Sequence, residues 1–289
     1  MIITKKKKGA KDYLYLRHSF RKNGKTITKE KYLGAKVPKN INEIILNFRK
    51  QLNEDLNKKL EKIRENFQKE WKRYPKSVKI KEKEEIAIAF TYNTNAIEGS
   101  TITLEEAREI IHEKISSNKP LRDVKETEAH SKVFLKMLDK KEKITNSLLL
   151  RWHKEIFGQT KADIAGKFRD YLVRIGMHIA PDWQEVKGLM NGLIGFIKKN
   201  KDKINPIELS ARAHYKFEKI HPFGDGNGRI GRLLINQMLW HEGYPMLIIE
   251  YKKRIAYYKA LNKSEDGFVS YFTRRYLLVN KRRLIVKGK

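Results

Sequence analysis

The sequence of 289 residues contains no cysteine, which excludes a disulfide scaffold, a thiolate-bound zinc or iron–sulfur site and a cysteine nucleophile. Its longest apolar runs fall far short of the roughly 20 residues that cross a bilayer, so no membrane partner is expected. The first ten residues carry lysines with no apolar stretch behind them, unlike a secretory signal. These absences predict a cytoplasmic, water-soluble protein.

Acidic side chains are scarce relative to basic ones. There are 34 Asp and Glu against 64 Lys and Arg, a formal net charge of +30. Residues 1–40 hold 13 basic and two acidic side chains, and the stretch 271–289 holds seven basic and none acidic. Such a field attracts polyanions. Nucleic-acid binding is one interpretation, and a lysine-rich surface typical of proteins from hot environments is the other.

Residues 1–38 are predicted to form a small basic β-hairpin module. The aromatic stretch 13–20 and the stretch 26–33 favour strands, and Asn23-Gly24 lies between them. Asn-Gly favours a tight hairpin turn because both residues adopt a positive φ at little cost. Pro38 ends the module.

Residues 39–83 are predicted to form a long amphipathic helix and a linker. Eight apolar side chains recur every three or four residues. They are Ile45, Phe48, Leu52, Leu56, Leu60, Ile63, Phe67 and Trp71. This spacing puts them on one face of a helix of about ten turns that ends near Pro75, before the basic stretch 76–83. So long a stripe must pack on the body of the protein, on a target protein or on a second copy in a homodimer.

Residues 84–289 are predicted to form an all-α domain. Helical apolar spacing recurs over nine stretches, which are 85–93, 103–116, 124–138, 145–157, 183–199, 206–220, 228–241, 254–262 and 268–279. Only the stretch 168–179 is predicted to be extended, as a short β-hairpin. The fold class is therefore all-α, with one such hairpin in the helical domain and another at the N-terminus.

The stretch from His221 to Arg232, with the sequence HPFGDGNGRIGR, carries the chemistry. Glycines alternate with Asp225 and Asn227 just before an apolar helix, so backbone N–H groups and the helix N-terminus converge on one point. This is an anion cradle suited to phosphates. Arg229 and Arg232 lie on one face of the first helical turn and can grip further phosphate oxygens. Asp225 is a hard oxygen ligand for Mg²⁺, and His221 is placed as a general base.

These twelve residues match the Fic signature, His-x-Phe-x-Asp/Glu-Gly-Asn-Gly-Arg-x-x-Arg, at every defined position. The resemblance to the Fic family runs from about Ala87 to Phe272. It implies an all-helical protein adenylyltransferase, which transfers AMP from ATP to a protein hydroxyl and releases pyrophosphate. The Doc-like branch, which transfers phosphate, departs from Gly-Asn-Gly, and the sequence here does not.

The resemblance also implies roles for individual residues. His221 takes the proton from the attacking hydroxyl, Phe223 anchors the loop and Asp225 binds Mg²⁺ between the α- and β-phosphates. The anion hole and the helix after it would hold the ATP phosphates through a run of residues. They are Gly226, Asn227, Gly228, Arg229 for the β-phosphate, Ile230, Gly231 and Arg232 for the γ-phosphate.

A second motif, Thr94-Asn95-Ala96-Ile97-Glu98-Gly99, resembles the inhibitory motif of the same family. The resemblance implies an inhibitory helix near residues 92–99, whose Glu98 pairs with Arg232 and withdraws it from the γ-phosphate. Loss of a buried carboxylate–arginine pair is costly enough to sustain strong repression. The sequence is thus similar to the self-inhibited class with an N-terminal inhibitory helix.

Two further groups of nucleotide contacts come from the resemblance. The stretch 168–179 resembles the flap that holds a target chain by edge pairing, and Ile175, Gly176, Met177 and His178 would border the nucleotide. Tyr257 and Tyr258 match an aromatic pair near adenine, although two tyrosines on a helix also suit a protein core.

Two alternatives to an AMP transferase stay open at this point. In some relatives the inhibitory glutamate positions water for the removal of AMP, so a de-AMPylating enzyme on the same site is one. A nucleic-acid-binding or interaction protein that uses its basic N-terminal module is the other. The partners expected for the transferase are Mg²⁺-ATP and a target protein with a Ser, Thr or Tyr hydroxyl, the chain itself included.

Overall fold

The computed structural model describes residues 1–9, 11–22, 25–52, 54–113, 118–175 and 178–285. Contacts divide the chain into two compact units, Met1–Glu61 and Lys62–Lys289. The division falls within the stretch 39–83, for which the sequence predicted a long helix and a linker. In the part of the chain that the structure describes, no helix is long and apolar enough to span a membrane.

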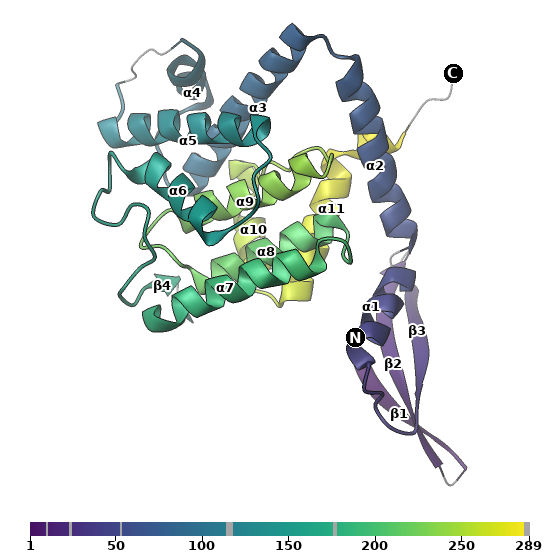
Figure 1. Cartoon of the computed structure of the whole chain (residues 1–289). Helices are drawn as coiled ribbons and strands as arrows, with labels where there is room; N and C mark the ends of the chain where they lie inside the picture. Colours follow the sequence, from purple (N-terminus) through teal and green to yellow (C-terminus); the bar gives the residue numbers. More distant parts are fainter. Residues whose placement is uncertain (10, 23–24, 53, 114–117, 176–177, 286–289) are drawn as a thin grey trace. The chain divides into compact units, whose positions relative to one another are not determined.

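The first unit is an antiparallel sheet covered on one face by a helix (Figure 1). Its strands β1 (Ile2–Lys8), β2 (Lys11–Lys22) and β3 (Lys25–Gly34) lie in the order β1-β2-β3. Leu16 and Leu33 pack with Phe48 of α1 (Ile41–Leu52) in a small core. The predicted turn at Asn23-Gly24 lies outside the described residues, and the strands on either side of it pair in antiparallel register.

The prediction of a two-stranded hairpin was wrong by one strand. β1 contains the run Lys5–Lys8, and lysine has a low β-propensity, so nothing in the local sequence indicated a strand. Lysine-rich strands are nevertheless common at sheet edges, where the charge discourages pairing with another chain. β1 is such an edge strand.

The predicted ten-turn helix is described as two helices, α1 and α2 (Glu54–Arg73), on either side of residue 53. Beyond Lys62 its apolar stripe packs on the body of the second unit. The ring centroids of Phe67 and Trp71 lie 5.9 and 5.2 Å from that of Trp240. The expected linker 76–83 is wrong, because these residues begin α3 (Lys76–Ile97). Lysine and glutamate are good helix formers, and a run of them was mistaken for a linker.

The second unit is helical, as predicted. Eight of its helices follow predicted stretches: α4 (Leu104–Arg108), α5 (Leu121–Asp139), α6 (Asn146–Phe157), α7 (Trp183–Asn200), α8 (Pro206–Ile220), α9 (Asn227–His241), α10 (Arg254–Leu261) and α11 (Glu265–Val279). The short helix α12 (Lys281–Leu284) was not predicted. A π-helical turn η1 (Glu109–Glu113) extends α4, and a 3₁₀ turn η2 (Tyr251–Lys253) precedes α10. The predicted extended stretch contains two short paired strands, β4 (Arg174–Ile175) and β5 (His178–Ile179).

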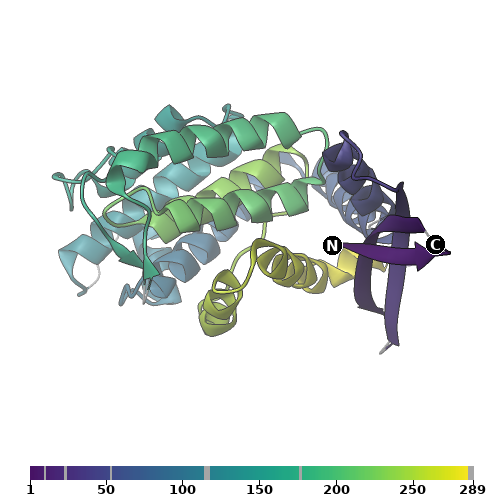
Figure 2. The ribbon, with the colours of Figure 1, turned by 90° about the horizontal axis from the view of Figure 1, so that it is seen from below.

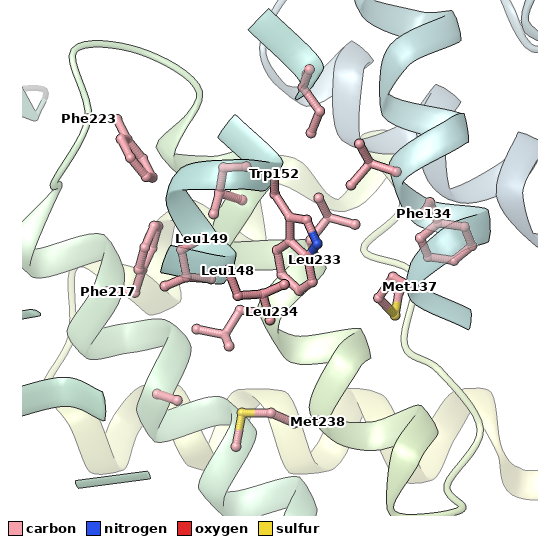
Figure 3. Packing of buried hydrophobic residues seen from close by; sticks show 14 of the residues in the cluster. Phe134, Met137, Leu148, Leu149, Trp152, Phe217, Phe223, Leu233, Leu234 and Met238 are labelled. Atoms are coloured by element: carbon pink, nitrogen blue, oxygen red, sulfur yellow. The ribbon is translucent and has the colours of Figure 1, made fainter. Parts of the chain in front are cut away.

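The core of this unit surrounds α9, which is buried along nearly its whole length. Helices α7, α8 and α9 lie side by side in both views of the ribbon (Figures 1 and 2). Side chains from α5, α6, α8 and α9 form the core, with Trp152 and Phe217 among the largest, and Phe223 from the turn between α8 and α9 packs with them (Figure 3). This packing fixes the turn between α8 and α9, and the turn carries the signature residues.

Candidate functional site

The turn between α8 and α9 is shaped by backbone conformations that most residues avoid. His221 is the C-cap of α8 and adopts left-handed angles, with φ 51° and ψ 61°. Among the described residues it is the only one other than glycine with a positive φ. Left-handed backbone costs about 1 kcal/mol or more for a residue with a Cβ, and such strain concentrates at functional sites. The strain ends the helix and puts His221 at the edge of the loop.

Two side chains hold the loop in shape. Phe223 is fully buried, and its ring stacks on His153 with centroids 4.0 Å apart. The side-chain amide of Asn227 donates to the carbonyl of Phe223 at 2.8 Å, and its oxygen accepts from the Phe223 N–H at 2.9 Å. The Asn227 side chain is thus engaged within the loop, so only its backbone is available to an anion.

The surroundings of His221 favour the neutral imidazole that a general base requires. Its Nδ1 lies 3.4 Å from the carbonyl oxygen of Glu218. A carbonyl only accepts, so Nδ1 carries the proton and Nε2 keeps its lone pair. Burial lowers the pKa of His221, and the hydrogen bond to Glu218 offsets only part of that effect. The imidazole is therefore neutral at neutral pH, as a proton acceptor must be.

Arg169, which sequence analysis did not single out, fastens this loop to the segment that leads to β4. It is 4% exposed. Its guanidinium donates to the carbonyls of His221 at 2.9 Å, Tyr171 at 2.8 Å and Pro181 at 2.6 Å. Its backbone N–H donates to the carbonyl of Pro222. One buried cation thus links His221 to residues at both ends of the extended stretch.

The glycines of the loop cannot carry side chains. A Cβ on Gly226, which has φ 78°, would lie 2.4 Å from the ring of Phe157. A Cβ on Gly228 would lie 2.2 Å from a carboxylate oxygen of Glu98 and 2.8 Å from the Arg232 guanidinium. The Glu98 carboxylate therefore lies against the first turn of α9, where the N–H groups of a helix N-terminus favour an anion.

Glu98 is the C-cap of α3 and forms an ion pair with Arg232. Its Oε1 accepts from an Nη of Arg232 at 2.6 Å. Arg232 is 2% exposed and also donates to Thr94, from Nε to the hydroxyl at 2.5 Å and from Nη to the carbonyl at 3.1 Å. The motif 94–99 thus surrounds the guanidinium that the sequence assigned to the γ-phosphate.

Arg229 lies in a separate network. It pairs with the buried carboxylate of Glu126, and its guanidinium lies 4.3 Å from the centre of the Phe157 ring. Lys161 contacts Glu126 at 2.9 Å and Asp225 at 2.6 Å. Burial raises the pKa of Glu126, but Arg229 and Lys161 outweigh it, so this carboxylate stays ionised. Sequence analysis found neither Glu126 nor Lys161, because their distance in the chain from the signature gave no local signal.

Asp225 fits the Mg²⁺ that was expected there. Its carboxylate is about half exposed, and Lys161 and Arg229 hold its pKa below the usual value against the opposing effect of burial. An ionised, accessible carboxylate beside an anion cradle is the ligand set that Mg²⁺ uses when phosphates and waters complete its shell. Lys161 must release or share this oxygen when a metal binds. Among the described residues, no cluster of three or more acidic, histidine or cysteine ligands exists.

Ile230 and Gly231 face the interior. Ile230 is fully buried in the core, and a Cβ on Gly231 would lie 2.8 Å from both Glu218 and His214. Among the residues that the structure describes, Glu218 Oε1 and His214 Nδ1 are buried atoms with no hydrogen-bond partner. Burial raises the pKa of Glu218 to about 7, although Arg232 opposes it. Ile230 therefore supports the loop from the core, and Gly231 leaves room for the side chains of Glu218 and His214.

The remaining predicted contacts divide between described and undescribed positions. Gly176 and Met177 lie outside the described residues, while Ile175 and His178 pair through their backbones where β4 meets β5. Tyr257 is 1% exposed, with its hydroxyl 2.7 Å from Nε2 of His214, so it belongs to the core. Tyr258 is half exposed, and its hydroxyl donates to the carbonyl of Ile97 at 3.1 Å.

Comparisons with known proteins agree with this geometry. The model of the Fic/DOC family matches residues 143–239. A protein adenylyltransferase Fic from Nematostella vectensis is 34% identical over 189 residues, which cover 63% of this chain and 44% of that protein. The chain spans less than half the length of the curated relatives it matches.

Solved structures share the fold. A Fic domain-containing signalling protein from Bacteroides thetaiotaomicron matches with a TM-score of 0.67 and 25% identity, over 78% of this chain and 96% of that one. Residues 134–508 of Fic-1 from C. elegans match with a TM-score of 0.67 and 25% identity, over 85% and 77% of the two chains. The signature loop, the helices around it and these relatives lead to one conclusion: residues 143–239 of the chain form a domain similar to those of the Fic/DOC family.

Proposed function

We propose that the chain is a protein adenylyltransferase, which transfers AMP from ATP to a hydroxyl side chain of a target protein. The observation that carries the proposal is the contact of Glu98 with both Gly228 and Arg232. The carboxylate occupies the place where a phosphate would meet the helix N-terminus and the arginine. Phosphate oxygens favour the same partners as this carboxylate, which are the N–H groups of a helix N-terminus and an arginine.

In the proposed reaction His221 Nε2 accepts the proton of the target hydroxyl. The hydroxyl oxygen attacks the α-phosphorus, the bond from that phosphorus to the bridging oxygen breaks, and pyrophosphate leaves. Phosphoryl-type transfer depends on positioning and charge neutralisation more than on covalent chemistry, which suits a site of glycines and arginines. Asp225 would hold Mg²⁺, which when bound neutralises charge on the phosphates.

In this proposal the backbone of residues 226–228 and Arg232 bind the phosphates after Glu98 has moved away. Arg229 is buried against Glu126, so it would have to contact a phosphate while it keeps its ion pair with Glu126. Arg169 keeps His221 at its place by holding its carbonyl. Leu172 and Ile179 are 61 and 65% exposed beside β4 and β5, and such apolar side chains at a short strand pair suit the backbone of a target segment.

The two alternative functions that the sequence left open, removal of AMP and nucleic-acid binding, are less well supported than AMP transfer. The curated proteins that match are named for adenylyl transfer, which favours it over removal of AMP. The basic module lies in the other unit of the chain, so nucleic-acid binding there does not compete with chemistry at His221.

The experiment that tests the proposal follows AMP into protein. The Glu98→Gly chain is incubated with ATP, Mg²⁺ and a cell lysate, and modified peptides are identified by mass spectrometry. A gain of one AMP on Ser, Thr or Tyr that disappears in Glu98→Gly/His221→Ala supports the proposal. Addition of phosphate in place of AMP, or AMP addition that survives His221→Ala, would refute it.

A further inference from the structure

The face of the N-terminal sheet that points away from α1 is a separate feature of the chain. The strand register assigns side chains to the two faces, because paired residues of an antiparallel sheet project to the same side. Thr4, Lys6 and Lys8 pair with Tyr15, Tyr13 and Lys11, and Tyr15 and Arg17 pair in turn with Tyr32 and Glu30. Leu16 lies between Tyr15 and Arg17 in β2, so its side chain projects to the opposite face and packs on α1.

Side-chain contacts confirm that these residues share one surface. The ring centroid of Tyr32 lies 5.9 Å from that of Tyr13 and 5.4 Å from that of Tyr15. The ammonium of Lys6 lies 5.0 Å from the centre of the Tyr15 ring. Tyr32, at the middle of the cluster, is 54% exposed. Three tyrosine rings therefore meet on the open side of a sheet.

We call this surface the tyrosine face, after Tyr13, Tyr15 and Tyr32, and its net charge is positive. Lys6, Lys8, Lys11 and Arg17 lie on it, and Glu30 is the one carboxylate among the side chains that the structure describes there. Glu30 contacts Lys6 and Arg17, so the two lysines at the β1–β2 end keep an unbalanced positive charge. A second copy of this chain, with a net charge of +30, would meet repulsion at such a surface.

Aromatic rings on an open sheet, bordered by lysines, match the requirements of unpaired bases. Each base presents a flat π-face that stacks on an aromatic side chain, while the backbone needs cations along its path. Bases in a duplex are already stacked on one another and cannot use the rings. We propose that the tyrosine face binds single-stranded nucleic acid, with bases on Tyr13, Tyr15 and Tyr32 and phosphates on Lys8 and Lys11.

The test measures binding of fluorescein-labelled dT20 to the full chain by anisotropy over a series of salt concentrations. Replacing Tyr32 by Leu keeps an apolar side chain but removes the ring, and we expect affinity to fall by about fivefold or more. Tyr32→Phe keeps the ring and restores affinity to within about twofold. Equal affinities for the chains with Tyr32, Leu and Phe would overturn the proposal.

Lysines elsewhere supply the charge control, since any protein of charge +30 attracts DNA to some degree. Lys8→Gln/Lys11→Gln is compared with Lys198→Gln/Lys199→Gln on α7, whose side chains are also exposed. We expect the slope of log affinity against log salt to fall by about 1.4 in the first pair and to stay unchanged in the second. Equal falls in both pairs would overturn the proposal. So would tighter binding of a dA20·dT20 duplex, or displacement of dT20 by poly-glutamate at equal charge.

Discussion

At the scale of the residue, the site depends on a few side chains in unusual surroundings. His221 has a left-handed backbone, Arg232 is almost wholly buried beside Glu98, and Glu218 has a buried carboxylate oxygen with no hydrogen bond among the described residues. The twelve-residue signature singled out His221 and Arg232 in the sequence, because it gathers all the residues proposed to bind phosphate in one stretch. The raised pKa of Glu218 was not predictable, because it depends on burial of the carboxyl against Gly231 in the folded chain.

The protonation of His221 is a direct consequence of its burial. We expect its imidazole to titrate with a midpoint below the ordinary value of 6.5, since burial disfavours the charged form. A depressed histidine pKa means that the base is lost only in acid and is fully present at neutral pH. Glu98 raises the pKa, so Glu98→Gly lowers the midpoint further. NMR titration of the imidazole, assigned with His221→Ala, measures both. A midpoint above 6.5 contradicts the account.

At the scale of the element, helix boundaries were the most predictable feature. Thr145, Asn205 and Ser264 each accept a backbone N–H as the N-cap of α6, α8 or α11. The apolar spacing that predicted these helices is local, and the caps, which the prediction did not use, are local as well. β1 and the first turns of α3 were missed, because a lysine run carries no periodic apolar signal. The contacts of Arg169, which join elements far apart in sequence, were beyond local patterns.

Arg169 offers a test of that joining role. Arg169→Lys keeps the charge but loses the fork that reaches the carbonyls of His221, Tyr171 and Pro181. We expect AMP transfer by the Glu98→Gly chain to fall tenfold or more, with kcat reduced more than the KM for ATP is raised. The melting temperature should fall as well, since a charged hydrogen bond contributes about 1.5–3 kcal/mol.

Lys167→Arg is the matched control, because it changes a neighbouring basic side chain in the opposite sense at an exposed position. It should leave both kcat and the melting temperature unchanged. If Arg169→Lys lowers the melting temperature but leaves kcat untouched, Arg169 supports the fold and does not position His221.

At the scale of the molecule, the chain combines two units of different character. The unit Lys62–Lys289 carries the Fic domain together with His221, the proposed base, and Glu98, the proposed inhibitory residue. The unit Met1–Glu61 carries the basic tyrosine face. Composition alone indicated the excess of positive charge and its concentration near the N-terminus, but only strand register separates the tyrosine face from the side that packs on α1.

The central claim is that the Glu98 carboxylate restrains the enzyme by occupying the cradle at Gly228 and Arg232. The measurement is the initial rate of AMP incorporation from labelled ATP into the chain itself, for the unchanged protein, Glu98→Gly and Glu242→Gly. Glu242 is a matched control, since it also caps a helix, α9, and precedes a glycine of positive φ. Its surface contacts are with Lys141 and Lys201, away from the loop.

The account predicts a rate at least about tenfold higher for Glu98→Gly, equivalent to about 1.4 kcal/mol of barrier, and no change for Glu242→Gly. Equal rates for the unchanged chain and Glu98→Gly, with both above the rate of His221→Ala, would contradict it.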